Sequence, residues 1–185
     1  MGILTCAITG YRPSRFRFKY NENNKDCKRI KRRMEEQLSL LYQKGVHHFI
    51  VGGALGVDMW AGEILLAMKE KSEFSEIKLT MALPFEGYDV DWDRVSRERK
   101  NQIQKQAEVL VIGKEPGTPS YTKRNHFMVD HADIVLAVYD NDRKIRSGTA
   151  LTVRYAERKE RPVILIHPDN GKVCCIGSSN TFLEN

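Results

Sequence analysis

Short apolar runs alternate with amphipathic segments along the whole chain. The runs are rich in β-branched residues, are bounded by turn residues and have no polar face. Such runs are typical of strands that are buried on both faces of a sheet. The predicted strands cover residues 4–10, 47–53, 78–85, 108–113, 133–140 and 162–167.

Helical periodicity occupies the intervals between the predicted strands. Apolar residues recur at helical spacing from Ile30 to Tyr42, and more sharply from Val57 to Met68. Each pattern predicts a helix with one buried face, and Trp60 on the second helix is predicted to lie in the core. Three further segments are compatible with helices, the first of them only weakly amphipathic: residues 92–107, 120–132 and 148–160.

This alternation predicts an α/β fold. Strands that alternate with helices form a parallel sheet covered by helices on both faces and joined by right-handed crossovers. We therefore expect a three-layer sandwich with a mostly parallel sheet. The 185 residues suffice for one hydrophobic core but not comfortably for two, so a single domain over 1–185 is expected. Residues 169–185 are expected to form a polar C-terminal tail that includes, as an option, a short strand around "KVCCIG".

Composition excludes several classes of protein. Apolar residues make up 41% and charged residues 29%, which does not fit a collagenous or disordered chain. No apolar run approaches the roughly 20 residues of a membrane span, and "MGILTCAITG" lacks the features of a signal peptide. We expect a cytoplasmic protein with no membrane partner. The four cysteines form no CxxC pair, so reduced thiols and no metal site are expected.

The formal net charge of +6 leaves two interpretations open. Runs of cations such as "SRFRFK" and "KDCKRIKRR" are commonly solvated surface, but they also suit a single-stranded nucleic acid. For the nucleic-acid alternative, the candidate contacts are Arg15, Arg17, Lys19, Arg29, Lys31, Arg32 and Arg33.

Unusual residues follow the ends of the predicted strands. In a parallel sheet all carboxyl ends share one edge, and ligands bind there where the strand order reverses. In "GGALGVD" after the second strand, Gly52, Gly53 and Gly56 allow a ligand to approach the backbone closely. The next helix begins with unpaired amides, which favour an anion and most naturally a phosphate. Tight packing of the helix on the sheet is the alternative role for these glycines.

Other loops at this edge also carry residues suited to binding an anion. Ser147, Gly148 and Thr149 begin a helix and form a second candidate anion nest. Arg12, in "TGYRP" after the first strand, offers a guanidinium suited to phosphate. Asp58 is either a helix cap or the partner of a ribose hydroxyl.

A helix that starts at the same edge contains "KRNHFMVDHAD". Arg124 and Asn125 near its beginning can reach the ligand edge, whereas His131 lies nearly two turns further along. Surface or core roles are expected for His126 and His131, because no third metal ligand is evident. Two aromatic residues in the loop after the third strand either stack on a base or pack against the protein: Tyr88 and Trp92.

Two familiar nucleotide motifs are missing. The glycine turn lacks the Lys-Ser/Thr ending of a P-loop, and its spacing is GGxxG rather than the GxGxxG of dinucleotide enzymes. Neither nucleoside triphosphate hydrolysis nor hydride transfer is therefore indicated, and no resident cofactor is expected.

Four motifs in this order carry a family resemblance: "TGYRP", "GGALGVDMWAGE", "RNHFMVDHADIVLAVYD" and "SGTALTVRYA". The chain resembles the YpsA-like proteins of the SLOG superfamily, which includes the DNA-processing protein A family and the LOG phosphoribohydrolases. The resemblance implies a Rossmann-like sheet, a bacterial origin and a homodimer. It also implies a nucleotide-type site formed by Gly10, Arg12, Gly52, Gly53, Gly56, Asp58, Arg124, Asn125, Gly148 and Thr149.

The chain departs from the LOG phosphoribohydrolases at one informative position. Those enzymes carry PGGxGTxxE, whose glutamate takes part in cleavage of the N-glycosidic bond, and Thr152 stands at the glutamate position here. Glu63, Glu86 or Asp58 replaces it only if one of them reaches the glycosidic carbon. The leading hypothesis is a sensor or regulatory protein for a nucleotide-like small molecule; the alternatives are a nucleotide N-glycosidase and a single-stranded nucleic-acid-binding protein.

Overall fold

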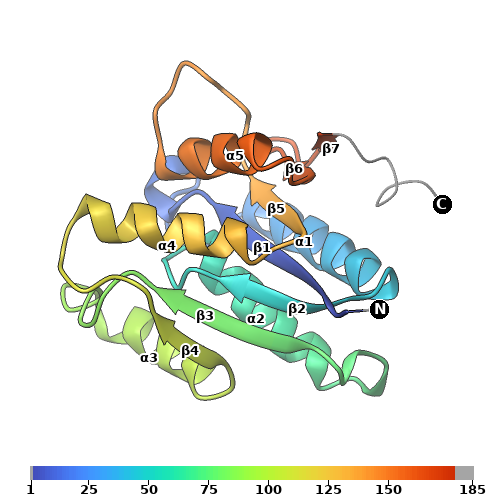
Figure 1. Cartoon of the computed structure of the whole chain (residues 1–185), viewed down its shortest axis with the longest axis horizontal. Helices are drawn as coiled ribbons and strands as arrows, with labels where there is room; N and C mark the ends of the chain where they lie inside the picture. The colour runs from blue at the N-terminus through green and yellow to red at the C-terminus, as the bar shows by residue number, and fades with distance from the viewer. Residues whose placement is uncertain (1, 178–185) are drawn as a thin grey trace.

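The computed structural model describes residues 2–177, which form a seven-stranded sheet between two layers of helices (Figure 1). The strands follow the order β4-β3-β2-β1-β5-β6-β7 across the sheet. All neighbours are parallel except β7, which runs antiparallel to β6. The predicted α/β class, with its Rossmann-like and mostly parallel sheet, is confirmed. The strands are β1 (Leu4–Gly10), β2 (Val46–Val51), β3 (Lys78–Leu83), β4 (Glu108–Val111), β5 (Ile134–Val138), β6 (Val163–Ile166) and β7 (Val173–Ile176).

Five α-helices divide between the two faces of this sheet. On the far face in Figure 1 lie α1 (Lys25–Gln43), α2 (Val57–Lys69) and α3 (Arg94–Gln104). The near face is covered by α4 (Thr118–Asp130) and α5 (Gly148–Arg158). Two single turns of 3-10 helix, Pro13–Arg15 and Ser72–Phe74, complete the described helical structure.

The strand order places a topological switch point at the centre of the sheet. From β1 the chain proceeds outward through β2, β3 and β4, and α4 then carries it back across the near face to β5, on the other side of β1. The loops that follow β1 and β5 therefore leave the sheet in opposite directions. A crevice opens between such loops at the carboxyl ends of the strands.

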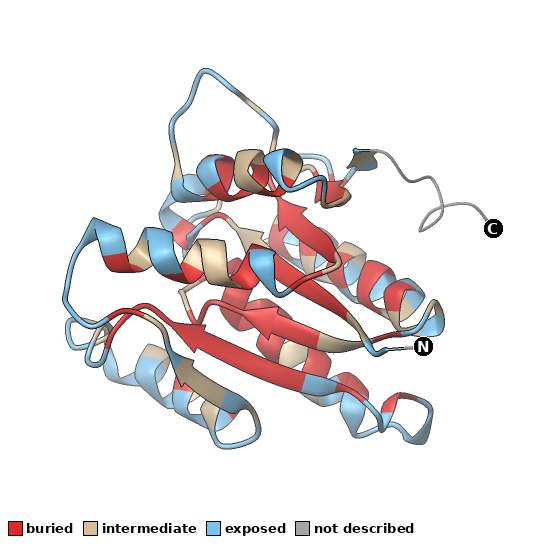
Figure 2. Ribbon diagram, in the orientation of Figure 1, coloured by how far each residue is buried: buried red, intermediate tan, exposed pale blue. Residues whose placement is uncertain are grey.

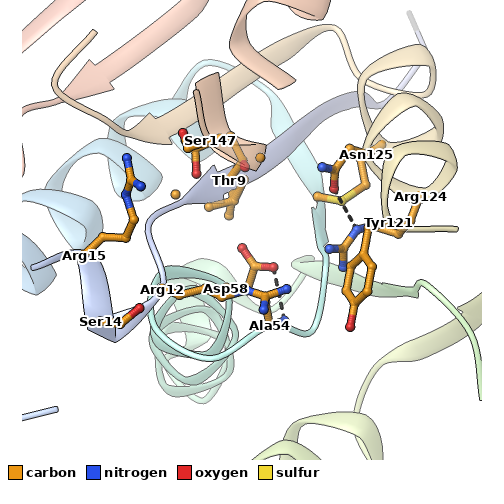
Figure 3. A pocket seen from close by; sticks show the side chains of 15 residues that line it. Thr9, Arg12, Ser14, Arg15, Ala54, Asp58, Tyr121, Arg124, Asn125 and Ser147 are labelled. Atoms are coloured by element: carbon orange, nitrogen blue, oxygen red, sulfur yellow. Dashed lines mark hydrogen bonds between the residues drawn. The ribbon is translucent and has the colours of Figure 1, made fainter. Parts of the chain in front are cut away.

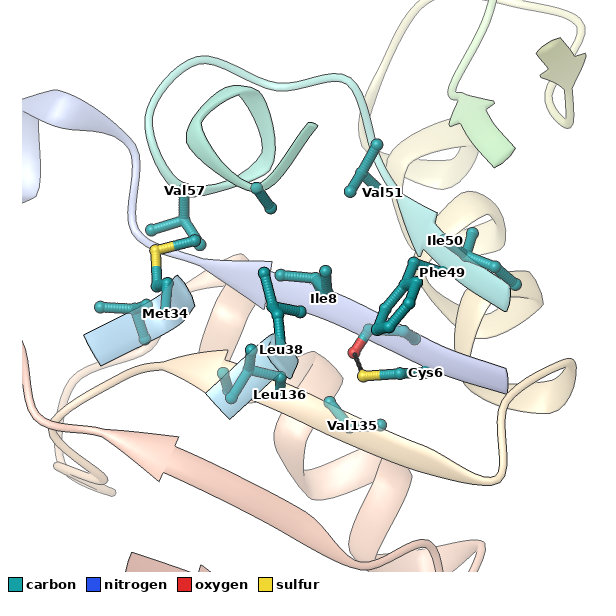
Figure 4. Close-up of a cluster of buried hydrophobic side chains, with 14 of the residues drawn as sticks. Cys6, Ile8, Met34, Leu38, Phe49, Ile50, Val51, Val57, Val135 and Leu136 are labelled. Carbon is teal, nitrogen blue, oxygen red and sulfur yellow. Dashed lines mark hydrogen bonds between the residues drawn. The ribbon is translucent and has the colours of Figure 1, made fainter. Parts of the chain in front are cut away.

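The core is formed by the central strands and by helices from both faces of the sheet. Ile8 and Phe49 of the sheet pack with Leu38 of α1 and Val57 of α2, and all four side chains are fully buried (Figure 4). Figure 2 shows the same burial along the inner strands. Each such aliphatic or aromatic side chain contributes roughly 1.5–3 kcal/mol of transfer free energy. Trp60 is 1% exposed, so its predicted core position is confirmed.

The strand ends differ from the predicted ones for a local reason. The runs predicted at 47–53 and 78–85 extend past β2 and β3, because their last residues are apolar or small but belong to the loops at the carboxyl edge of the sheet. The optional strand around "KVCCIG" exists as β7 and pairs with β6. The part of the predicted tail from residue 178 onward lies outside the described residues.

Glu22 anchors the segment that joins β1 to α1. Its carboxylate accepts hydrogen bonds from Arg99 Nη1 (2.9 Å), Lys31 Nζ (2.6 Å) and Trp60 Nε1 (2.9 Å). Partial burial alone raises the pKa of Glu22, but the three donors outweigh it and lower the pKa to about 2. A carboxyl group in the unfolded chain titrates near pH 4.3, so its ionised form stabilises the fold.

We expect Glu22→Gln to lower the free energy of unfolding by about 1–2 kcal/mol at pH 7, a value reduced for solvent screening of this partly exposed group. Because the pKa is lowered in the folded state, the stabilisation is present above about pH 4.3 and disappears as pH falls toward 2. Urea unfolding at pH 7 and pH 3 measures both effects. The exposed Glu73→Gln serves as the control. If the free energies of unfolding of the wild type and of Glu22→Gln depended on pH in the same way, the lowered pKa of Glu22 would be contradicted.

Candidate functional site

A cavity of about 290 Å³ lies at the switch point, beyond the carboxyl ends of β1 and β5 (Figure 3). Side chains from β1, the turn after it, α2, α4 and the start of α5 converge on it. The structure thus brings together segments that are far apart in the sequence. The predicted site residues that line it are Gly10, Arg12, Asp58, Arg124, Asn125, Ser147, Gly148 and Thr149.

The first turn of α5 is arranged to accept an anion. Ser147 caps the helix, and its side chain accepts a hydrogen bond from the amide of Ala150 at 3.0 Å. The amides of Gly148 and Thr149 have no acceptor within residues 2–177. A Cβ on Gly148 would meet no atom within 4 Å, so these amides are open to the cavity. The Thr149 side chain is only 7% exposed, and its hydroxyl also lacks a partner among the described residues.

Arg12 adds a positive charge across the cavity from this turn (Figure 3). Its guanidinium lies over the ring of Tyr121 at 5.4 Å and forms no hydrogen bond or ion pair with any residue that the structure describes. Arg15, one turn further, lies over the ring of Tyr11 at 5.0 Å and also lines the cavity. The field of the cavity therefore favours an anionic guest.

Asp58 stands in the first turn of α2 and neutralises that helix end itself. Its Oδ2 accepts a hydrogen bond from the amide of Ala54 at 3.2 Å. Burial raises the pKa of Asp58, while the positive charge of Arg124 and the amide of Ala54 oppose that rise. A carboxylate in this position repels phosphate, so the α5 end of the cavity suits a phosphate better than the α2 end.

Gly52, Gly53 and Gly56 do not line the cavity; they serve close packing around it. A Cβ on Gly52 would lie 2.7 Å from Oδ2 of Asp58 and would clash with the guanidinium of Arg124. Gly56 has a φ of +84°, and a Cβ there would lie 2.7 Å from the carbonyl oxygen of Tyr11. The glycine turn thus permits the side chains of the site to approach one another.

Arg124 holds the glycine turn and the cavity wall together. Its side chain is 5% exposed, and Nη1 donates to the carbonyl oxygen of Gly52 and, at 3.3 Å, to that of Ala82. Nε donates to Oδ1 of Asn125 at 2.8 Å, which leaves the amide group of Asn125 as a donor at the cavity. Burial lowers the pKa of Arg124, and the nearby Asp58 carboxylate opposes this shift.

Sequence reasoning missed part of the cavity wall. Tyr121 lies one turn before Arg124 on α4, and its ring is 5.4 Å from the Arg12 guanidinium and 5.8 Å from that of Arg124. The sequence did contain a signal for Tyr121: residues three apart on a helix lie on the same face, so Tyr121 shares the face of Arg124. Arg15 was assigned only to the nucleic-acid alternative. The remaining polar side chains on the wall are Thr9 and Ser14.

The carboxylates considered for bond cleavage occupy different places. Glu63 pairs with Arg99 at 2.7 Å, and Glu86 does not line the cavity. Thr152 stands at the position of the LOG glutamate, and its hydroxyl donates a hydrogen bond to the carbonyl oxygen of Gly148 at 2.9 Å. Of the three candidate carboxylates, Asp58 alone lines the cavity.

The basic run is largely compensated within the protein. Arg17 pairs with Asp169, Arg29 with Asp26 and Lys31 with Glu22. Glu36 lies within ion-pair distance of both Arg32 and Arg33. These pairs indicate that much of the basic run serves the protein's own surface.

The two histidines and the loop aromatics make specific contacts. His126 stacks on Tyr155 at a centroid distance of 3.8 Å, and Nδ1 of His131 lies 2.8 Å from the carbonyl oxygen of Phe127. Tyr88 donates to the carbonyl oxygen of Gly53 at 2.7 Å and meets Trp92 edge-to-face at 5.5 Å. In residues 2–177 His, Cys, Asp and Glu side chains nowhere gather in groups of three or more that could hold a metal ion. No helix in this range is long and apolar enough to cross a membrane.

These observations define a Rossmann-like α/β protein with a cationic cavity at the point where the strand order reverses. Residues 6–170 match the family model YpsA, described as the YspA SLOG family, and the chain belongs to this family. The family resemblance read from the motifs is thereby confirmed. A UPF0398 protein of Halalkalibacterium halodurans is 27% identical over 158 residues, which cover 84% of this chain and 82% of the relative.

Two solved structures share the fold at low sequence identity. DNA processing protein A from Streptococcus pneumoniae superposes with a TM-score of 0.59 at 16% identity, and 88% of this chain covers 50% of that one. The corresponding protein from Helicobacter pylori, described with a single-stranded DNA binding mode, gives a TM-score of 0.56 at 20% identity. That match covers 88% of this chain and 65% of the Helicobacter protein. The chain thus spans no more than about two thirds of either protein.

Proposed function

We propose that this protein binds a nucleotide, or a phosphorylated ribose compound derived from one, and acts as a sensor or regulatory protein. The observation that carries the proposal is the convergence of two groups that attract anions on one cavity. They are the open amide end of α5 and the guanidinium of Arg12, neither of which has a hydrogen-bond or ion-pair partner among the described residues. Thr149 is buried, and a buried donor is costly to leave without an acceptor, which a phosphate supplies.

The phosphate is assigned to the α5 side of the cavity. There the amides of Gly148 and Thr149, the Thr149 hydroxyl and Arg12 offer donors of the kind that bind phosphate oxygens. Arg15 increases the local positive potential. The net charge of these groups matches a mono- or dianionic phosphate.

The ribose is assigned to the α2 side. The Asp58 carboxylate lines the cavity and retains acceptor capacity beyond its bond to the amide of Ala54. A ribose diol donates two hydrogen bonds and adds no negative charge, so it fits beside Asp58. A recess of about 30 Å³ between Arg12, Tyr88, Trp92 and Tyr121 adjoins this side and is too small to hold a base, but Tyr121 also lines the cavity and offers a base an aromatic side chain there.

Isothermal titration calorimetry tests the proposal. The panel contains AMP, GMP, UMP, cyclic nucleotides, ADP-ribose and NAD, together with the 2′,3′-dideoxy analogue of each monophosphate. We expect at least one ligand to bind with a Kd of roughly micromolar order, and its dideoxy analogue to bind at least tenfold more weakly. The absence of binding by every member at millimolar concentration would overturn the proposal.

One observation supports a second candidate, an N-glycosidase. Asp58 is a buried carboxylate on the cavity wall, with a pKa raised by burial, as suits a general base. Chromatography of nucleoside monophosphates after long incubation with the protein, and with Asp58→Asn, detects released base. Release that requires Asp58 supports the enzyme, and intact substrate excludes it.

A further inference from the structure

A second hollow adjoins the cavity between α4 and α5. It has a volume of about 360 Å³, and Thr122 and His126 of α4 face Leu151 of α5 across it. Arg146, in the loop that precedes α5, stands at its margin. The contacts assigned above to phosphate and ribose leave this groove unused. We refer to it as the α4–α5 groove.

The cavity and the α4–α5 groove meet at the anion-binding end of α5. Ser147 and Gly148 belong to the walls of both, and on the α4 side the two hollows share Tyr121 and Asn125. No Cβ stands at Gly148 to separate them, and the space beside its Cα is open to 4 Å. A phosphate on the amides of Gly148 and Thr149 therefore has room on two sides.

Size and chemistry both indicate that the groove is occupied by part of the ligand. The cavity alone, at about 290 Å³, is at the lower limit of the roughly 300–1,000 Å³ typical of small-molecule sites. The groove carries the hydroxyls of Thr118 and Thr122, the guanidinium of Arg146 and the imidazole of His126, whose ring is stacked on Tyr155. This mixture of donors and flat surfaces suits a sugar or a heterocycle.

From this junction we infer that the ligand's phosphate group is internal. The nucleoside lies in the cavity, the phosphate or diphosphate lies at the start of α5, and a second polar group, esterified to the other end of this phosphate or diphosphate, lies in the α4–α5 groove. The ligand class is thus a nucleoside diphosphate ester or a dinucleotide rather than a nucleotide with a terminal phosphate. This inference rests on the proposed function and deepens it.

Three matched pairs of ligands test the inference by calorimetry: ADP with ADP-ribose, GDP with GDP-mannose, and UDP with UDP-glucose. Within a pair the base, ribose and diphosphate are the same, and only the second ester differs. We expect the esterified member to bind at least tenfold more tightly in the pair whose base fits the cavity. Equal affinity, or tighter binding of the unesterified diphosphate, would overturn the inference and leave the proposed function standing.

A variant that fills the α4–α5 groove tests whether the preference for the esterified ligand arises there. Leu151 is exposed on α5 and lines the groove but not the cavity, so Leu151→Trp fills the groove without altering the cavity wall. We expect this variant to lose the preference for the ester, to within twofold, with unchanged affinity for the diphosphate. The matched control is Val95→Trp on α3, where the valine is 60% exposed and lines neither hollow; it should retain the preference.

The remaining outcomes are equally decisive. A preference that survives in Leu151→Trp, while the variant remains folded by circular dichroism, would place the second group elsewhere and overturn the inference. If no diphosphate and no ester binds to the wild type, the inference fails, and the proposed function fails with it only if the monophosphates and cyclic nucleotides also do not bind. Tighter binding of an oligothymidylate than of any ester, with affinity that falls steeply as salt rises, would instead favour the nucleic-acid alternative and overturn both.

Discussion

Replacing Arg12 with glutamine is expected to lower the affinity for the nucleotide ligand by tenfold to about a hundredfold and to leave the stability of the fold unchanged. A hydrogen bond between charged groups contributes about 1.5–3 kcal/mol, which corresponds to this range of Kd. The fold is spared because Arg12 forms no hydrogen bond or ion pair with the described residues and only packs over Tyr121. Calorimetry with the tightest ligand of the panel, beside urea unfolding, measures the two quantities.

The matched control for Arg12 is Arg17→Gln. Arg17 lies in the same segment, carries the same charge and is 83% exposed in an ion pair with Asp169. Its removal lowers the general positive potential without touching the cavity, so we expect less than a twofold change in Kd at 0.15 M salt. Equal losses in the two variants would show that long-range charge, and not a contact made by Arg12, governs binding.

Replacing Arg124 with methionine is expected to lower the free energy of unfolding by about 3–5 kcal/mol. The guanidinium is buried and donates to the backbone carbonyl groups of Gly52 and Ala82, which lose their donor. The nearby Asp58 charge stays buried without Arg124, the stronger of the two cationic influences on it, which is the costly outcome for a disrupted buried charge pair. Because burial raises the pKa of Asp58 in the folded state, protonation relieves part of this cost, and the deficit relative to the wild type should narrow as pH falls.

A double-mutant cycle separates the charge effect from lost packing. Adding Asp58→Asn to Arg124→Met removes the uncompensated carboxylate, and we expect the double variant to recover at least 1 kcal/mol relative to Arg124→Met alone. Arg97→Met on the exposed surface of α3 is the control, expected to change stability by less than about 0.5 kcal/mol. Strict additivity of Arg124→Met and Asp58→Asn would contradict an electrostatic coupling between the two side chains.

The arrangement around Arg12 is suited to preorganised binding. The segment after β1 is held by stacking of Phe16 on Phe18, by contact of Phe16 with Trp60 at 5.3 Å, and by the three donors to Glu22. A rigid segment places the guanidinium of Arg12 at the cavity before the ligand arrives, which reduces the entropy lost on binding.

Much of the fold follows from local patterns. The run at residues 4–10 coincides with β1, because apolar residues and a terminal glycine both mark its ends. The helix from Val57 is equally clear, since its apolar face repeats without interruption. The predicted strand runs to residue 53, but β2 ends at Val51. Gly52 and Gly53 are small and neutral, so the local pattern does not distinguish these loop residues from buried strand residues.

Part of the candidate site was likewise predictable from local sequence, and part was not. Arg12, Ser147 and Thr149 were predicted from residue type and from their place after a strand, and the structure brings them to one cavity. Gly52 was predicted to approach a ligand; in the structure it lies against the side chain of Arg124 and does not line the cavity. The α4–α5 groove was not predicted, because it depends on how two helices pack against each other.

The sequence by itself determined the α/β class, the family and the edge of the sheet at which charged loops gather, because periodicity, glycine position and motif order are local properties of the chain. Only the tertiary structure decided which donors remain available at that edge. The Ala54 amide is taken by Asp58 and the Gly52 carbonyl oxygen by Arg124, 72 residues further along, whereas the first amides of α5 stay open. Hydrogen-bond partners across such distances are set by packing in three dimensions, and the packing leaves the first amides of α5 open at the cavity, whereas the three glycines of the glycine turn do not line it.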